Sequence, residues 1–201
     1  MTSTHNSPFG GSSGTFDNAG TLNWNGTYAT WGYSDIDAAF NNTGTVNVND
    51  HLRLTNGGTD TGSYSVANGK TLTFASGTRN LDTGSNISGT GTLAVTSGTV
   101  NVTGGFDIST TGTALNLSGG TLNLNNALSV GTLNLSGGTL GGAGNLTTTG
   151  PFNITGNRNL ILVVIWIKSC ICQSANCCRL RNCIGIHYPK IICLPLGICR
   201  L

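Results

Sequence analysis

The sequence predicts an all-β fold, a right-handed parallel β-helix in which short strands stack coil upon coil. Three observations lead to this prediction. A Gly-Thr-Leu or Gly-Thr-Val unit recurs before residue 156, as at 91–93 and 120–122. Apolar residues alternate with Asn or Thr inside each unit, and Gly-containing turn formers bound it. Charge is scarce, since 8% of the residues are charged and glutamate is absent.

The repeat has the spacing of a β-helical coil. Residues 16–23, which begin Phe-Asp-Asn, return as residues 40–47, 24 positions later. Residues 97–102 return as 119–124 after 22 positions, and another Gly-Thr-Leu follows 18 positions further on. Recurrence of this kind is typical of solenoids. We therefore expect about three short strands per coil of 18 to 24 residues.

Each predicted strand is a run of only a few alternating residues, punctuated by turn formers such as Gly-Gly or Asn-Gly. A period of two places the apolar residues on one side and Asn or Thr on the other. Stacking about 4.8 Å apart would bury a Leu and Val column and allow the Asn residues to form ladders. Equal spacing also permits an antiparallel β-sandwich, which is the alternative fold. The alternating triplets are 22–24, 46–48, 52–54, 72–74, 93–95, 100–102, 115–117, 122–124 and 133–135.

Composition divides the chain near residue 156. All seven cysteines lie in residues 157–201, which contain no threonine and only two of the 31 glycines. The formal charge is −4 before the boundary and +6 after it, and nothing before it resembles a basic nucleic-acid-binding surface. We predict a disordered N-terminus over 1–9, a solenoid over 10–156 and an irregular tail over 157–201.

The unit at 136–147, Ser-Gly-Gly-Thr-Leu-Gly-Gly-Ala-Gly-Asn-Leu-Thr, resembles the β-strand repeats of bacterial autotransporter passengers and filamentous-haemagglutinin-like secreted adhesins. The resemblance covers about residues 10–156. It implies an extracellular, surface-displayed solenoid that contacts glycans, matrix or other cells, and it carries over no catalytic residue. Residues 1–10 have neither a basic nor an apolar region typical of a secretory signal. We therefore interpret the chain as an internal piece of a longer exported protein, with further repeats of the parent chain as neighbours.

The cysteine-rich tail has three interpretations. Its apolar run at 160–167 is well short of the roughly 20 residues that a membrane helix needs, so no membrane span is predicted. Its cysteines are spaced Cys-x-Cys and Cys-Cys rather than as paired Cys-x-x-Cys, which argues against zinc or a disulfide framework. The favoured hypothesis is translation in a shifted frame, because a Cys codon read one base later encodes Val or Ala. In that case the tail has no evolved function.

Aromatic and acidic residues cluster near the N-terminus. Exposed aromatic rings can stack on sugars, and two carboxylates on one side of a strand suit an acid and base pair or a hard cation. The alternatives are a cap whose rings fill the interior, and solvated turn acids. The candidate ligand-binding residues are Trp24, Tyr28, Trp31, Tyr33, Asp35 and Asp37.

Known catalytic and cofactor motifs are missing from the sequence. His5, His51 and His187 are scattered, and no Ser/His/Asp set, phosphate loop or dinucleotide fingerprint occurs. We therefore expect no enzyme, cofactor or metal. The predicted function is a structural, adhesive segment of a secreted or surface-displayed bacterial protein. The alternatives are a polysaccharide-binding or polysaccharide-cleaving β-helix and a nonfunctional gene fragment.

Overall fold

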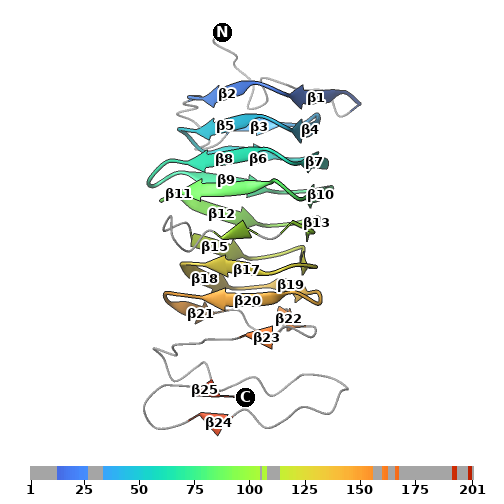
Figure 1. Cartoon of the computed structure of the whole chain (residues 1–201). Helices are drawn as coiled ribbons and strands as arrows, with labels where there is room; N and C mark the ends of the chain where they lie inside the picture. Colours follow the sequence, from blue (N-terminus) through green and yellow to red (C-terminus); the bar gives the residue numbers. More distant parts are fainter. Residues whose placement is uncertain are drawn as a thin grey trace.

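The computed structural model describes residues 13–26, 34–104, 106–107, 114–155, 160–162, 166–167, 192–193 and 199–200. Every regular element in these residues is a short β-strand. The strands of the repeat wind into a solenoid of stacked coils, in which most strands pair with the strand three elements further along the chain (Figure 1). Each coil therefore contributes one strand to each of three faces.

Face 1 is an unbroken parallel sheet of eight strands. In spatial order they are β1 (Thr15–Asn18), β4 (Ala39–Asn42), β7 (Gly58–Asp60), β10 (Thr78–Leu81), β13 (Thr99–Val102), β16 (Thr121–Leu124), β19 (Gly138–Gly141) and β22 (Leu160–Leu162).

Face 2 consists of two four-stranded sheets. The first contains β2 (Thr21–Trp24), β5 (Thr45–Val48), β8 (Ser63–Val66) and β11 (Asn86–Gly89). The second contains β14 (Phe106–Asp107), β17 (Leu128–Val130), β20 (Asn145–Thr148) and β23 (Trp166–Ile167).

Face 3 is a parallel sheet of seven strands. They are β3 (Ser34–Ile36), β6 (Leu52–Leu54), β9 (Thr71–Phe74), β12 (Thr92–Val95), β15 (Ala114–Leu117), β18 (Thr132–Leu135) and β21 (Phe152–Ile154). Outside the three faces, β24 (Ile192–Cys193) and β25 (Cys199–Arg200) form an antiparallel pair.

Segments that repeat in the sequence lie side by side in the structure. Phe16 pairs with Phe40, and Thr99 pairs with Thr121 on a later pair of coils. Thr121 in turn pairs with Thr139. The parallel β-solenoid and its variable coil length are thus confirmed, because each repeat of the sequence pairs with the next. The alternative of an antiparallel sandwich is wrong, because every strand pair described on the three faces is parallel.

Two parallel strand pairs are described beyond residue 155. Strand β22 pairs with β19 on face 1, and β23 pairs with β20 on face 2. Residues 160–162 and 166–167 therefore take strand positions on two faces of the solenoid. Residues 1–9 and most of 157–201 lie outside the described residues.

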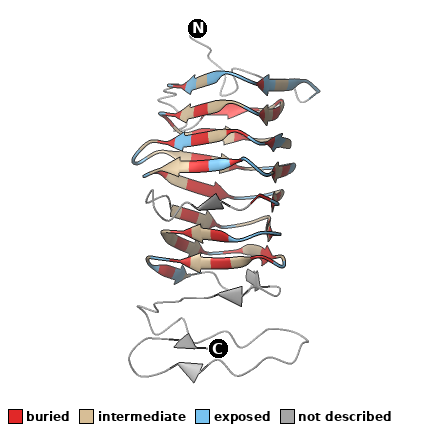
Figure 2. Cartoon of the chain, in the orientation of Figure 1, coloured by how far each residue is buried: buried red, intermediate tan, exposed pale blue. Residues whose placement is uncertain are grey.

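The core is a set of aliphatic columns inside the coils. Leu72, Leu93, Leu115 and Leu133 lie at equivalent positions on successive strands of face 3 and are all buried. The buried positions alternate with less buried ones along most strands, as in β5, β9 and β16 (Figure 2). Burying one such side chain contributes about 1.5–3 kcal/mol, so strands too short to be stable singly are held by the stack.

Several glycines of the Gly-Thr-Leu and Gly-Thr-Val units lie at corners where successive coils touch, as at positions 98, 120 and 138. Gly120 has a φ of +67°, a conformation that favours glycine. A Cβ atom there would lie 2.6 Å from the carbonyl oxygen of Gly98 in the preceding coil. The following Thr begins the strand and the Leu points inward. The motif is therefore a corner and the first half of a strand, and it recurs on all three faces, as in β2, β12 and β16.

Asparagine ladders cover the outside of the coils, as the sequence predicts. On face 1, Asn101 Nδ2 donates to Asn80 Oδ1 at 2.9 Å, and Asn123 Nδ2 donates to Asn101 Oδ1 at 2.9 Å. On face 3, Asn134 Nδ2 donates to the amide oxygen of the preceding coil at 2.7 Å, and Asn153 Nδ2 donates to Asn134 Oδ1 at 2.8 Å. These bonds tie each coil to the next through side chains as well as backbone.

Candidate functional site on the first coils

The predicted aromatic cluster is only partly described. Trp24 ends β2 and is 5% exposed, and its Nε1 atom donates to the carbonyl oxygen of His51 at 3.3 Å. Its indole ring therefore belongs to the core and fills the interior of the first coils. Tyr28, Trp31 and Tyr33 lie outside the described residues.

The two predicted acids lie beside β6 on face 3. Asp35 is paired with Arg53 in register, and Arg53 binds it through two hydrogen bonds, Nε to Oδ1 at 2.7 Å and Nη2 to Oδ2 at 2.6 Å. Asp37 follows the strand and accepts a hydrogen bond from the hydroxyl of Thr55. Because Ile36 between them is fully buried, the two acids share the outer side of the coil.

A second ion pair occupies the turn between faces 2 and 3. Lys70 Nζ donates to Asp50 Oδ1 at 2.8 Å, and the backbone N–H of His51 donates to the same oxygen at 2.9 Å. Burial disfavours the ionised carboxylate, but these two hydrogen bonds and the charge of Lys70 outweigh it. The pKa of Asp50 therefore lies below its ordinary value.

Sequence reasoning missed both cationic partners, although a signal was present. Arg53 follows Asp35 by 18 residues, and Lys70 follows Asp50 by 20 residues. Both separations equal one coil of the repeat. Searching for opposite charges one coil apart would have found these pairs, because parallel stacking places such residues side by side.

A charged cluster is buried in the core between faces 1 and 2. We call Asp60, Tyr64 and Arg79 the buried charge cluster. Arg79 Nη1 donates to Asp60 Oδ2 at 2.7 Å, and Tyr64 Oη donates to Asp60 Oδ1 at 2.9 Å. The backbone N–H of Asn42 also donates to Oδ1, at 3.1 Å. None of the three cluster residues is more than 1% exposed.

Burial controls the protonation of this cluster. It raises the pKa of the Asp60 carboxyl, against the opposing effect of the Arg79 guanidinium and the hydrogen bonds to the carboxylate. Burial and the neighbouring carboxylate also raise the pKa of Tyr64 well above its usual range. Solvent does not reach these groups, so they serve the structure of the coils rather than a ligand.

Neighbouring oxygens satisfy both Nη atoms of the Arg79 guanidinium, whereas its buried Nε has no hydrogen-bond partner among the described residues. Its Nη1 donates to the carbonyl oxygen of Phe40 at 3.1 Å, and its Nη2 donates to that of Gly57 at 3.2 Å. The guanidinium carbon lies 6.0 Å from the ring centre of Phe40 and 5.1 Å from that of Phe74, within the range of a cation–π contact. In the sequence Thr78-Arg79-Asn80, Arg79 occupies the position that is apolar and inward in other repeats. This departure from the repeat was the signal in the sequence that could have predicted a buried charge.

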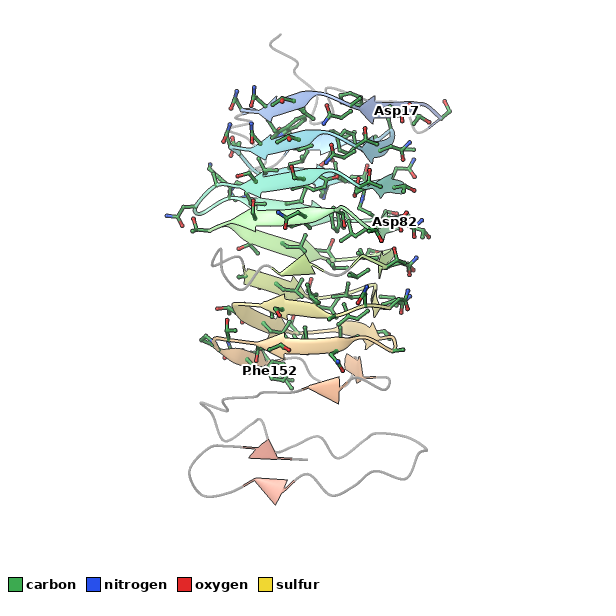
Figure 3. All side chains as sticks on the ribbon, in the orientation of Figure 1. Asp17, Asp82 and Phe152 are labelled. Atoms are coloured by element: carbon green, nitrogen blue, oxygen red, sulfur yellow. The ribbon has the colours of Figure 1, made fainter. Side chains whose placement is uncertain are left out.

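The later coils contrast with the charged early ones. Between Asp82 and Arg158 the sequence has one charged residue, Asp107. The outward positions of these coils are mostly Thr, Asn and Ser. Side chains project from the coils along the whole solenoid, and Asp17 and Asp82 lie on the same side of it (Figure 3). We call residues 83–104 and 114–155 the neutral coils.

The architecture places the chain among β-solenoid proteins. In the part of the chain that the structure describes, no three His, Cys, Asp or Glu side chains gather as a metal site would require. The same residues contain no helix with the length and apolar character to cross a membrane. No protein-family model, curated protein or solved structure matches the chain.

Proposed function

We propose that this chain is a structural and adhesive segment of a secreted or surface-displayed bacterial protein. The observation that supports the proposal is the unbroken parallel stack of face 1, whose outer side in the neutral coils carries hydrogen-bonding groups without charge. Because each coil buries its apolar face only against its neighbours, such a stack extends in one dimension and suits a spacer or stalk.

The outer side of the neutral coils is suited to uncharged, hydroxyl-rich partners. Outward Thr and Asn side chains recur at each coil, so donors and acceptors repeat about every 4.8 Å along the solenoid. Without charge, the surface neither attracts nor repels ions at long range. We propose glycans, extracellular matrix and neighbouring cells as partners, and further repeats of the parent chain as neighbours at the ends of the stack.

A binding experiment with the full chain tests the adhesive role. Purified protein is applied to arrays of neutral glycans, to matrix proteins and to intact cells. We expect binding that falls about tenfold in a Thr121→Val and Thr139→Val variant, because two outward hydroxyls are lost at little cost to strand propensity. The matched control is Thr45→Val, which lies on face 2 outside the neutral coils. This variant should bind like the wild type. Absence of binding to every surface would refute the adhesive role.

Polysaccharide cleavage is not proposed. A glycosidase needs one carboxyl group that donates a proton and another that acts as nucleophile or base. Here both oxygens of Asp35 accept hydrogen bonds from Arg53, and Asp37 accepts one from Thr55. These contacts fit a structural role for the two acids on the outer side of face 3.

A further inference from the structure

The repeat itself specifies the stacking order only weakly. Strands β5 and β13 have the same sequence, Thr-Val-Asn-Val, and β16 and β18 are both Thr-Leu-Asn-Leu. Exchanging such strands, or sliding one by two residues, keeps apolar side chains inside and Asn outside. Because the side-chain period is two, the aliphatic columns and the Asn ladders tolerate these errors. Something else must select a single register.

The buried charge cluster distinguishes the native strand pairing from the alternatives that the repeat allows. Its members come from three different strands, Asp60 from β7, Tyr64 from β8 and Arg79 from β10. Arg79 also needs the carbonyl oxygens of Phe40 and Gly57, which belong to β4 and to the turn before β7. These bonds form together only when β7 lies between β4 and β10 with Asp60 opposite Leu81.

Gly58 prevents another strand of the repeat from taking the place of β7 beside Arg79. It is the register partner of Arg79 on the preceding strand. A Cβ atom at this position would lie 1.9 Å from the carbonyl oxygen of Phe40 and 3.2 Å from Nη2 of Arg79. A Thr-Leu-Asn strand therefore cannot replace β7, because its inward Leu would occupy the space that the guanidinium needs.

We infer that the buried charge cluster fixes the register of the early coils, from β4 to β12. In a wrong register Arg79 would be buried among aliphatic side chains without its carboxylate, which is heavily unfavourable. In the native register the attraction largely offsets the cost of removing both charges from water. An uncharged pair that keeps an acceptor for Tyr64 and for the N–H of Asn42 would therefore support comparable stability, and the cluster acts mainly by excluding alternative pairings.

Hydrogen exchange of the full chain, followed by mass spectrometry, tests this inference. The key variant is the double substitution Asp60→Asn and Arg79→Met, which removes both charges and keeps an amide oxygen at position 60 to accept from Tyr64 and from the backbone N–H of Asn42. We expect it to keep the β-sheet circular dichroism of the wild type and to melt within about 4 °C of it. Peptides covering residues 57–103 should separate into two exchange populations, where the wild type has one. The control Val100→Leu changes the packing at the neighbouring inward position of β13 and should keep one population.

Two results would overturn the inference. One is a single exchange population in the double variant, with the protection of the wild type, because register would then not depend on the cluster. The other is loss of folded structure in the double variant, because the cluster would then act through stability rather than specificity. The single variant Arg79→Met separates these cases: it should melt well below the double variant, since it leaves the Asp60 carboxylate buried without a counter-charge.

Discussion

Replacing Arg79 by Met should destabilise the protein more than the same replacement at Arg53. Arg79 and Asp60 are at most 1% exposed, so the substitution leaves a buried carboxylate without its counter-charge. Breaking such a pair costs about 3–5 kcal/mol, which lowers the melting temperature by about 6–20 °C in a chain of this size. The Arg53 side chain is 32% exposed and that of Asp35 9%, so water reaches this pair from one side and the loss should be smaller, about 1–3 kcal/mol.

The pH dependence identifies the cause of this loss. Burial raises the pKa of Asp60 above its value of 3.8 in a free side chain. A carboxyl whose pKa is raised by folding is tolerated below the unfolded pKa and becomes destabilising as the pH rises toward the folded pKa. Removing Arg79 raises the folded pKa further. The loss in the Arg79→Met variant should therefore be smallest near pH 4 and should grow toward pH 8.

Denaturant unfolding of the wild type and both variants between pH 4 and pH 8 measures these losses. The reasoning is refuted if the Arg79→Met and Arg53→Met variants lose equal stability. It is also refuted if the loss at Arg79 does not depend on pH, because the cost would then come from packing rather than from the charge left on Asp60.

Three further predictions concern other parts of the solenoid. Folding lowers the pKa of Asp50 below 3.8, so ionised Asp50 stabilises the folded state, by at most about 1 kcal/mol. This stabilisation is present above pH 4 and is lost at lower pH. The unfolding curves of Asp50→Asn and the wild type should therefore converge as the pH falls below 4. Gly120→Val should destabilise by more than about 2 kcal/mol, because φ is positive and the backbone of the preceding coil lies against it. Thermal melting that matches the wild type would contradict this. Asn134→Ala breaks two ladder bonds and should cost about 1–2 kcal/mol by denaturant unfolding, whereas Thr155→Ala, at the exposed end of the same face, should be neutral.

Much of the fold could be predicted because the signals are local and repeated. Alternation with a period of two in Leu122-Asn123-Leu124 is enough to predict which side chains are inside. The recurrence of Phe16 at Phe40 predicted the first coil length, since identical strands stack well in register. The choice between parallel coils and an antiparallel sandwich could not be made in this way. Both arrangements use the same alternation, and only the strand partners differ.

The candidate site was less predictable. The sequence identified Asp35 but not its partner Arg53, and it counted Trp24 among possible sugar-binding rings although the ring is buried. A side chain at the end of a strand can turn inward or outward depending on what the next coil places against it. That information lies a full coil away in the sequence, at a separation that changes from coil to coil.

The sequence by itself determined the strands, their inward and outward sides, the glycine corners and the asparagine ladders, because each depends on residue type at a short, regular spacing. Only the tertiary structure decided which charges are paired and which are buried. Arg79 is the clearest case, since a charged residue is expected at the surface. It lies inside because Gly58 leaves space, Asp60 supplies a carboxylate and Phe40 supplies a carbonyl, and stacking alone brings these three together.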